Sequence, residues 1–292
     1  MLTTFVTIAE LKSFGDAARR LNMTLSAVSM QMKSLEADLG AALFDRGHRP
    51  PRLTAQGAAL VPYARAVTTA ERELLRASAP QAALAGTLHV GFVLSASVRL
   101  LPSFLKAAQR DAPNVTFEVA TGLSEALEKK VADGRLDLAV LTAVQLDDEV
   151  FEYRVLRTEP LVYALPRTHE ANGIDWLFAH LPFLHFAPAT GIGQLISRHL
   201  DALTCERHRT IVLDGMEASM ECARAGVGFT ILPEPDVARY ADLTIATRPV
   251  HTPSHGGNPT TETITRDIAL IARRGHFSPQ QWRQVTALFD HT

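Results

Sequence analysis

The chain has 292 residues, enough for about two domains at roughly 100–200 residues each. Hydrophobic residues make up 47% and charged residues 21%, a balance that indicates a folded globular protein and excludes a disordered chain. The formal net charge is −2, yet the first 80 residues hold ten Lys and Arg against seven Asp and Glu, which hints at a polyanionic partner confined to one end.

The opening residues and the hydropathy pattern argue against secretion or membrane insertion. No run approaches the ~18 apolar residues of a membrane span. The first twenty residues lack the basic and apolar regions of a signal peptide, since Lys12 and Asp16 interrupt them. Only two cysteines are present, too few for a disulfide framework. We therefore expect a cytoplasmic protein with no membrane partner.

Three helical patterns stand close together at the start of the chain. In the second, apolar residues follow the spacing of an amphipathic helix at Phe14, Ala17, Ala18 and Leu21. Ser13 precedes this run and is its expected N-cap. The third helix is expected to end at Gly40, and its apolar stripe is Val28, Met32, Leu35 and Leu39. Two short helices joined by a tight turn predict a helix-turn-helix.

The opposite side of the third helix is small and polar. It carries Ser26, Met30, Lys33 and Ala37, with Ser29 at its shoulder. A helix that only completed a core would usually turn Glu and Lys toward water. This face therefore suits a helix in the major groove of DNA, where acidic side chains would repel phosphate.

Residues 43–54 are expected to form a small β-hairpin or wing. Gly47 and the pair Pro50-Pro51 supply its turn, and its charge comes from Arg46, Arg49 and Arg52. From residue 54 to about residue 83, apolar residues recur near a helical period. This pattern predicts one long helix that could pack on a twin.

From Gly86 onward, strand-like and helix-like segments alternate. Strands are expected at 88–94, 115–121, 136–142, 161–166, 210–213, 229–233 and 266–274, and helices at 98–111, 124–134, 193–203, 216–226 and from Ser278 onward. This alternation is typical of βαβ units around a parallel sheet.

Ligands of open parallel sheets bind beyond the carboxyl ends of the strands. The small and polar residues expected there are Ser95, Ala96, Ser97, Thr121, Thr142 and Thr190. Ser95 to Ser97 open a helix, so their hydroxyl and N–H groups could hold a carboxylate or a similar anion. Phe229 could form an apolar wall. The alternative is that these Ser and Thr residues only cap helices. No arginine stands out in these loops, which favours a small, partly apolar ligand over a dianion.

Other chemistries have little support. Cys205 and Cys222 could form a redox switch, but the second lies on an apolar helix face, where a thiol is usually inert packing. The eleven histidines are scattered without the spacing of a metal site. The run 225–228 (AGVG) lies between a helix and a strand, which is the wrong order for a dinucleotide fingerprint.

Residues 13–60 resemble the winged helix-turn-helix of the LysR-type transcriptional regulators. The matching elements are SF..AA..L at 13–21, SAVS.Q at 26–31, LE..LG at 35–40, LF.R at 43–46 and RLT..G at 52–57. Weaker matches run along the rest of the chain, with GTLHVG at 86–91, LLP at 100–102, LDLAV at 136–140, EPLVYALP at 159–166 and AGVGFTILP at 225–233. So many ordered elements at fixed spacing make the resemblance specific.

The resemblance implies a division into three parts. These are a winged helix-turn-helix at 1–58, a long linker and dimerisation helix at 59–85, and a two-lobed α/β effector domain of the periplasmic-binding-protein type at 86–292. Lobe I would span about 86–161 and 266–292, and lobe II about 162–265. Ser95 matches a position where the family usually has a hydroxyl that contacts the effector, while Thr142 and Thr190 match less closely.

Members of this family often carry glutamine second in the recognition helix and arginine near its middle. This chain has Leu25 and Met30 there. Base reading should then depend on Thr24, Ser26, Ser29, Gln31 and Lys33. The wing residues Arg46, Arg49 and Arg52 are the expected contacts to phosphate or the minor groove.

The resemblance implies a sequence-specific DNA-binding regulator whose DNA binding and bending respond to a small-molecule effector, with no other cofactor. Its expected partners are an interrupted inverted repeat of duplex DNA, further copies of itself as dimer or tetramer, and RNA polymerase; it would lie in the cytoplasm, at the nucleoid when bound to DNA. A solute-binding protein is disfavoured by the lack of a signal peptide and by the added 85 N-terminal residues. An α/β enzyme is disfavoured because no nucleophile elbow, P-loop or paired catalytic carboxylates stand out.

Overall fold

The computed structural model describes residues 1–45, 47–48, 52–78, 84–203, 205, 208–240, 242–252 and 262–290. The chain divides into two compact units, residues 1–81 with 133–135 and residues 82–132 with 136–292. Among the described residues, no helix is both long enough and apolar enough to span a bilayer.

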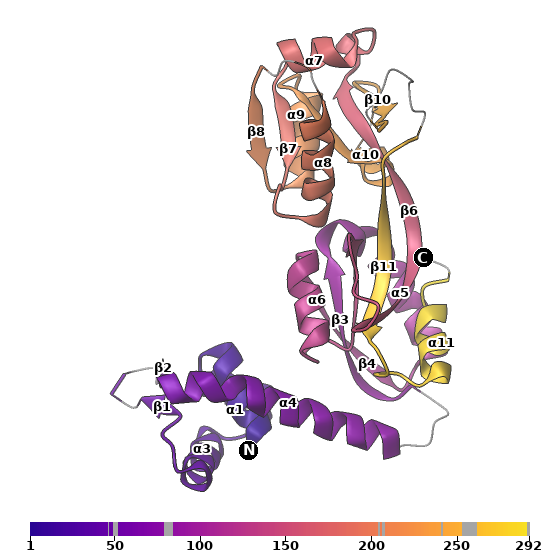
Figure 1. Ribbon diagram of the computed structural model, residues 1–292. Coiled ribbons are helices and arrows are strands. Elements are labelled where there is room, and N and C mark those ends of the chain that lie inside the picture. Colours follow the sequence, from indigo (N-terminus) through magenta and orange to yellow (C-terminus); the bar gives the residue numbers. More distant parts are fainter. Residues whose placement is uncertain are drawn as a thin grey trace. The chain divides into compact units, whose positions relative to one another are not determined.

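The first unit is a helix-turn-helix with a wing and a long following helix (Figure 1). Its elements are α1 (Leu2–Leu11), α2 (Phe14–Arg20), α3 (Leu25–Leu39), β1 (Phe44–Asp45), β2 (Arg52–Leu53) and α4 (Ala55–Ser78). The two short strands pair antiparallel, as expected for the wing.

Side-chain and glycine caps fix where the short helices begin and end. The Asp16 N–H donates to Ser13 Oγ at 3.2 Å, and the Ala27 N–H donates to Thr24 Oγ1 at the same distance. Gly40 ends α3 with a left-handed φ of 62°. The predicted caps at Ser13 and Gly40 are confirmed. The expectation that Leu39 belongs to the apolar stripe that packs in the core is wrong. Leu39 lies in the last turn of α3, beyond the core that Val28 enters, and is 47% exposed.

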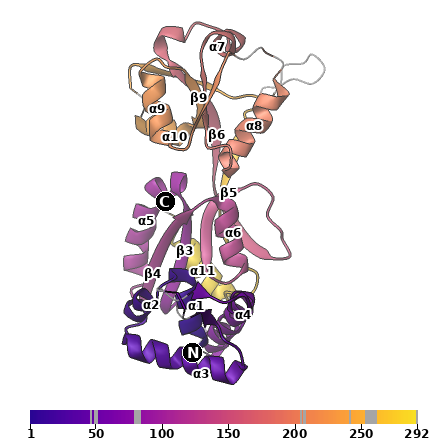
Figure 2. The same cartoon turned by 90° about the vertical axis from the view of Figure 1, so that its left-hand side faces the viewer.

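Lobe I of the second unit follows the predicted alternation. It contains β3 (Gly86–Val93), α5 (Leu94–Asp111), β4 (Val115–Gly122), α6 (Ser124–Ala132) and β5 (Leu138–Ala143), with β3 parallel to both β4 and β5. Helices α5 and α6 flank this part of the sheet (Figure 2). Its core also takes in α11 (Pro279–Ala287), which opens with the expected capping box of Ser278 and Gln281.

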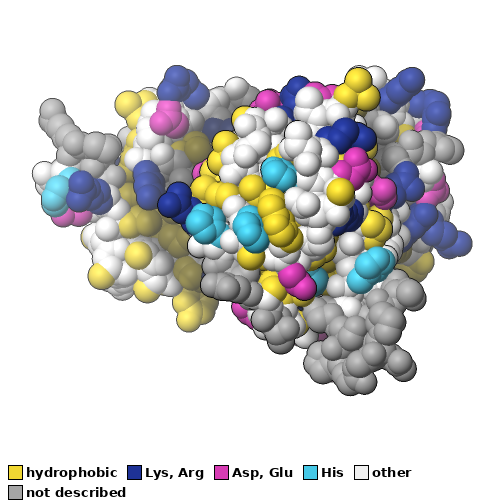
Figure 3. Space-filling view, turned by 90° about the horizontal axis from the view of Figure 1, so that it is seen from above, with side chains coloured by type: hydrophobic (Ala, Val, Ile, Leu, Met, Phe, Trp, Pro, Cys, Tyr) yellow, Lys and Arg dark blue, Asp and Glu magenta, His cyan; other side chains and the backbone are white. Residues whose placement is uncertain are grey.

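Lobe II has its own hydrophobic core. It contains α7 (Ile174–His180), β7 (Phe183–Phe186), α8 (Gly191–Ala202), β8 (Thr210–Leu213), α9 (Met216–Arg224), β9 (Phe229–Pro233), α10 (Glu234–Tyr240) and β10 (Ile245–Pro249). Figure 3 looks onto the end that carries α7, where histidine and apolar side chains lie together. There the ring of Trp176 lies 4.4 Å from that of His180 and 5.4 Å from that of His169, centre to centre.

Two long strands join the lobes. β6 (Phe151–Pro166) pairs with β11 (Thr265–Arg273) through residues 151–160, and with β9 and β10 through residues 161–166. The sheet order is β4-β3-β5-β11-β6-β9-β7-β8, with β10 also on β6. The two passages between the lobes therefore lie side by side as an antiparallel pair (Figure 1).

Candidate functional site

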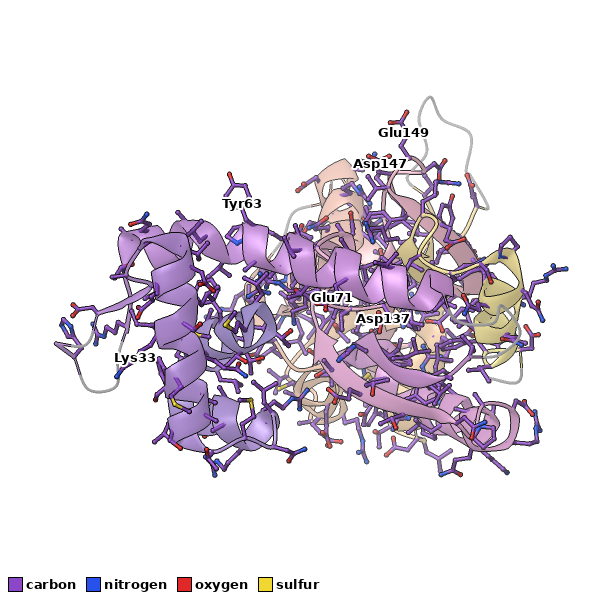
Figure 4. All side chains as sticks on the ribbon, turned by 90° about the horizontal axis from the view of Figure 1, so that it is seen from below. Lys33, Tyr63, Glu71, Asp137, Asp147 and Glu149 are labelled. Carbon is purple, nitrogen blue, oxygen red and sulfur yellow. The ribbon has the colours of Figure 1, made fainter. Side chains whose placement is uncertain are left out.

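One side of α3 is bare in the first unit. We call Ser26, Ser29, Met30, Lys33 and Ala37 the exposed face of α3. All are exposed except Ser29, which is half-buried. Val28, Met32 and Leu35 of the same helix are buried. Figure 4 shows Lys33 projecting outward from α3. The helical pattern predicted from the sequence is therefore present.

Two polar residues of α3 point away from this face. Thr4 Oγ1 donates to Gln31 Oε1 at 2.5 Å, which draws the Gln31 amide toward α1. This contact occupies the carbonyl oxygen of Gln31, and base reading by Gln31 stays a prediction. The Glu36 carboxylate accepts the N–H groups of Leu43 and Phe44 at 2.9 and 3.1 Å. The acid nearest the middle of α3 is thus turned toward the wing backbone and away from the exposed face.

The wing and the N-terminus of α3 hold the other expected DNA contacts. Thr24 is exposed, and its Oγ1 lies 3.0 Å from Ser26 Oγ. Arg52 is exposed on β2. Arg46 and Arg49 lie outside the described residues. The Gly47 N–H and the His48 ring hold the pKa of Asp45 below its usual value, so this wing carboxylate stays charged near neutral pH.

Helix α4 carries a second bare stripe, and this one is apolar. Tyr63 and Leu74 are each 70% exposed, and Val67 is 53% exposed. These residues are four and seven positions apart, so they share one face of the helix. Tyr63 points outward from α4 in Figure 4. Ala64 and Thr68, on another face, are buried.

In the second unit, Ser95 belongs to a cluster of buried charges. Arg99 and Arg266 alternate with Glu159 and Asp236, and we call these four residues the charge ring. Arg99 donates to Asp236 and to Glu159, both at 2.7 Å. Arg266 donates to Glu159 and to Asp236, both at 2.8 Å. The second amino group of Arg266 donates to Ser95 Oγ at 3.0 Å.

The charge ring connects both lobes through both joining strands. Glu159 on β6 lies directly opposite Arg266 on β11. Arg99 comes from α5 of lobe I and Asp236 from α10 of lobe II. Burial opposes ionisation of Arg99, but the Asp236 and Glu159 carboxylates outweigh it and raise the pKa of this guanidinium. The cluster is electrically balanced, as groups this deeply buried require.

The N-terminus of α8, which Thr190 caps, lies close to Thr142 of β5 at a second place between the lobes. Thr190 caps α8, since its Oγ1 accepts the Gly193 N–H at 3.0 Å. A Cβ on the next residue, Gly191, would lie 3.3 Å from Thr142 Cβ on β5. The N-terminus of α8 therefore packs against the end of a lobe I strand. The structure therefore shows Thr190 as a helix cap, and its contact with an effector stays a prediction.

The remaining expected effector contacts differ in accessibility. Thr121 is exposed near the end of β4. Ala96 and Ser97 are buried in the first turn of α5, and Ser97 Oγ donates to the Leu94 carbonyl at 2.8 Å. Phe229 is fully buried, in ring contact with Tyr163, Phe178 and Phe183. Phe229 is therefore part of the lobe II core, which corrects its assignment as a pocket wall.

Other reactive groups of lobe II have structural partners. Cys205 and Cys222 are both half-buried and pack against the lobe II core. The Tyr163 hydroxyl lies 2.7 Å from His199 Nε2, and burial lowers the pKa of His199 to about 4. Within the part of the chain that the structure describes, no group of three or more His, Cys, Asp or Glu side chains is placed to hold a metal ion.

Two family models match this chain along nearly its whole length. Residues 1–58 match the bacterial regulatory helix-turn-helix protein, lysR family, and residues 81–291 match the LysR substrate binding domain. The regulator YnfL of Escherichia coli is 30% identical in an alignment of 243 residues that covers 78% of this chain and 80% of that protein. A probable hydrogen peroxide-inducible genes activator of Mycobacterium avium is 27% identical, over 80% of this chain and 76% of that protein.

Solved full-length structures share the fold. A full-length OxyR variant from Pseudomonas aeruginosa has a TM-score of 0.70 and 22% identity, covering 99% of this chain and 93% of that one. CbnR in complex with its target DNA has a TM-score of 0.63 and 22% identity, covering 100% and 98%. A DNA-binding helix-turn-helix joined to a two-lobed effector domain defines an effector-responsive transcriptional regulator, not an enzyme. The chain belongs to the LysR family of transcriptional regulators.

Proposed function

We propose that the exposed face of α3 enters the major groove of an operator, with Thr24, Ser26, Ser29 and Lys33 as polar contacts. The wing arginines, Arg46, Arg49 and Arg52, would contact phosphate or the minor groove. The observation that carries this proposal is that the exposed face holds one cation and no carboxylate among its five side chains. An acid there would be repelled by phosphate, whereas the Lys33 cation is attracted to it.

Alanine substitution of Ser29 and Lys33 together tests this proposal. The variant should weaken binding to a selected operator at least tenfold, because a base contact and a phosphate contact are each worth about 1 kcal/mol or more. The matched control is Ser103→Ala/Lys106→Ala on α5, which removes the same two side chains from the effector domain. Binding by the α3 variant that equals wild type and the control would reject α3 as the recognition helix.

The apolar stripe of α4 supports a dimer. Tyr63, Val67 and Leu74 would pack on the same residues of a second chain, which removes their apolar surface from water. Two recognition helices held in this way would read an interrupted inverted repeat. Further contacts between effector domains would build a tetramer. Sedimentation of Val67→Asp/Leu74→Asp should show a smaller assembly than wild type.

The effector domain takes a small molecule, and we propose that it binds between the lobes near Ser95, Thr142 and Thr190. Arg266 already donates to Ser95 Oγ, so the Ser95 hydroxyl proton remains to be given to a ligand acceptor. Ser95→Ala should then flatten the effector dose response and leave basal DNA binding intact. A thermal-shift screen of small carboxylates with wild type and Ser95→Ala identifies the ligand and tests this contact together.

Effector binding would act by population shift. A ligand that binds one arrangement of the lobes more tightly than another favours that arrangement, and thereby changes the bend of the bound DNA. The regulated step would be recruitment of RNA polymerase. Such a protein would work in the cytoplasm, at the nucleoid when bound to its operator.

A further inference from the structure

Two large apolar side chains of α3 are exposed to solvent. Met30 is 66% exposed and Leu25 is 54% exposed, although the same helix buries Val28, Met32 and Leu35. We propose that Leu25 and Met30 are specificity-determining residues that contact thymine methyl groups, so that each operator half-site carries A·T pairs where these two side chains reach. This inference rests on the proposed entry of α3 into the major groove.

The positions of the two side chains fit this role. Ser26, Ser29 and Lys33 form a polar arc along α3. At about 100° per residue, Leu25 and Met30 lie on either side of this arc. Leu25 is the first residue of α3, and base contacts are concentrated near the N-terminus of a recognition helix. Both apolar groups would therefore meet base edges on the two flanks of the polar contacts.

The surroundings favour DNA over a protein as the occupant of this face. Around the helix axis, Lys33 lies between Leu25 and Met30. Arg52 of the wing is exposed in the same unit. The Glu36 carboxylate is turned inward to the Leu43 and Phe44 N–H groups. The face is therefore apolar and cationic, which complements a groove lined by phosphates and is poorly matched to a second copy of itself.

Thymine is the base that these side chains can recognise. In the major groove, every base edge offers hydrogen-bond donors or acceptors, and thymine alone adds a methyl group at C5. Neither Leu nor the Met thioether offers a strong hydrogen-bond donor. Contact with a methyl group removes apolar surface from water, and loss of one such contact weakens binding roughly fourfold.

Replacing thymine by deoxyuracil tests this contact directly. Deoxyuracil keeps every hydrogen-bonding group of thymine and lacks only the methyl. An operator is first selected from a random duplex pool with the full-length protein, and each dT is then replaced in turn. Replacement at one or two positions per half-site should weaken wild-type binding roughly fourfold. Replacement at every other dT should leave the affinity unchanged.

Variants assign the positions to side chains. Met30→Ala should bind the dT operator roughly fourfold more weakly than wild type and should become insensitive to deoxyuracil at one of the two sensitive positions. Leu25→Ala should show the same two effects, with the insensitivity at the other position. The matched control is Leu39→Ala, which truncates an exposed leucine at the far end of α3. It should keep the full wild-type pattern. All three residues are exposed, so circular dichroism should show an unchanged fold.

The failures of the inference and of the proposed function are distinguishable. If wild type binds the selected operator but tolerates deoxyuracil at every position, the methyl contact is wrong and the recognition helix stands. If Met30→Ala and Leu25→Ala leave DNA affinity unchanged but alter the sedimentation of the protein, the face is an interface between copies and the inference is overturned. If no duplex is selected, or if Ser29→Ala/Lys33→Ala binds as wild type does, both proposals fall.

Discussion

Arg266 donates to Ser95 Oγ at 3.0 Å across 171 positions of sequence. The same guanidinium holds Glu159, which lies opposite it in the pair of strands that joins the lobes. A residue expected to contact the effector is thereby connected to the charge ring. Any ligand that moves Ser95 would act on the contacts that tie α5 to α10, which gives a physical route from effector to lobe arrangement.

Removing one member of the charge ring should lower the free energy of unfolding more than removing an oppositely charged pair from it. Arg266→Met leaves two buried carboxylates facing only Arg99, and should lower the free energy of unfolding by about 3–5 kcal/mol. The double variant Arg266→Met/Glu159→Leu keeps Arg99 with Asp236 in charge balance and should recover most of that loss. Urea denaturation of the full chain measures both. Equal loss in the single and double variants would show that packing, not charge balance, decides stability here.

Gly57 should tolerate no side chain. A Cβ at this position would lie 2.2 Å from the backbone oxygen of Leu43, so the start of α4 would have to move away from the wing. Gly57→Ala should cost about 1–3 kcal/mol through this overlap. Gly15→Ala is the matched control, because its Cβ would meet nothing closer than Ser13 Oγ at 3.9 Å. It should raise stability by up to about 1 kcal/mol.

Amide hydrogen exchange within α2 and α3 measures how each glycine variant changes the stability of the first unit, separately from the effector domain. Faster exchange in Gly57→Ala and slower exchange in Gly15→Ala are expected. Unchanged protection in Gly57→Ala would mean that the wing shifts without loss of stability.

Lobe II should weaken in mild acid. Burial lowers the pKa of His199 from 6.5 to about 4. Between these two pH values the unfolded chain is protonated at His199 and the folded chain is not. The contribution of His199 to the free energy of unfolding is complete above pH 6.5. It falls by at most about 3 kcal/mol as the pH drops toward 4. Burial also lowers the pKa of His185, which adds to the slope.

Tryptophan fluorescence isolates this effect. Trp282→Phe leaves Trp176 of α7 as the reporter of lobe II unfolding. Replacing His199 by Gln in that background should remove most of the slope between pH 6.5 and 4. A slope that is the same with and without His199 would assign the acid sensitivity to other groups.

The salt dependence of DNA binding should report phosphate contacts one at a time. Lys33→Ala and Arg52→Ala should each reduce the slope of log affinity against log salt by about 1, since each contact releases about one condensed counterion. Lys106→Ala, in the effector domain, should leave the slope unchanged. A reduced affinity with an unchanged slope would instead indicate direct base contact.

The helices of the first unit could be predicted because their signals are local. Ser13 and Gly40 stand where short-range capping rules place them, and the stripe of Val28, Met32 and Leu35 has helical spacing. Leu39 fits the same stripe but lies in a last turn with no core beside it. The spacing of apolar residues predicts which face of a helix is buried. It does not predict how far along the helix the core extends.

The charge ring could not be predicted because its partners are remote in sequence. Arg99 is 60 positions from Glu159 and 137 from Asp236. In the sequence each resembles an ordinary surface charge, since burial of a paired charge leaves no local pattern. The same holds for Phe229, whose strand β9 runs between β6 and β7 in the interior of the sheet. The sequence patterns did not predict α7, β7, α10, β10 or the part of β6 before residue 161.

Photo-crosslinking from α3 tests the central claim most directly. A photoreactive amino acid placed at Met30 of the full-length protein, mixed with a selected operator and irradiated, should attach to bases of the half-site. The same group at Tyr63, equally exposed but on α4, should attach to a second copy of the chain and not to DNA. Specific operator binding without any crosslink from position 30 would contradict the claim that α3 reads DNA.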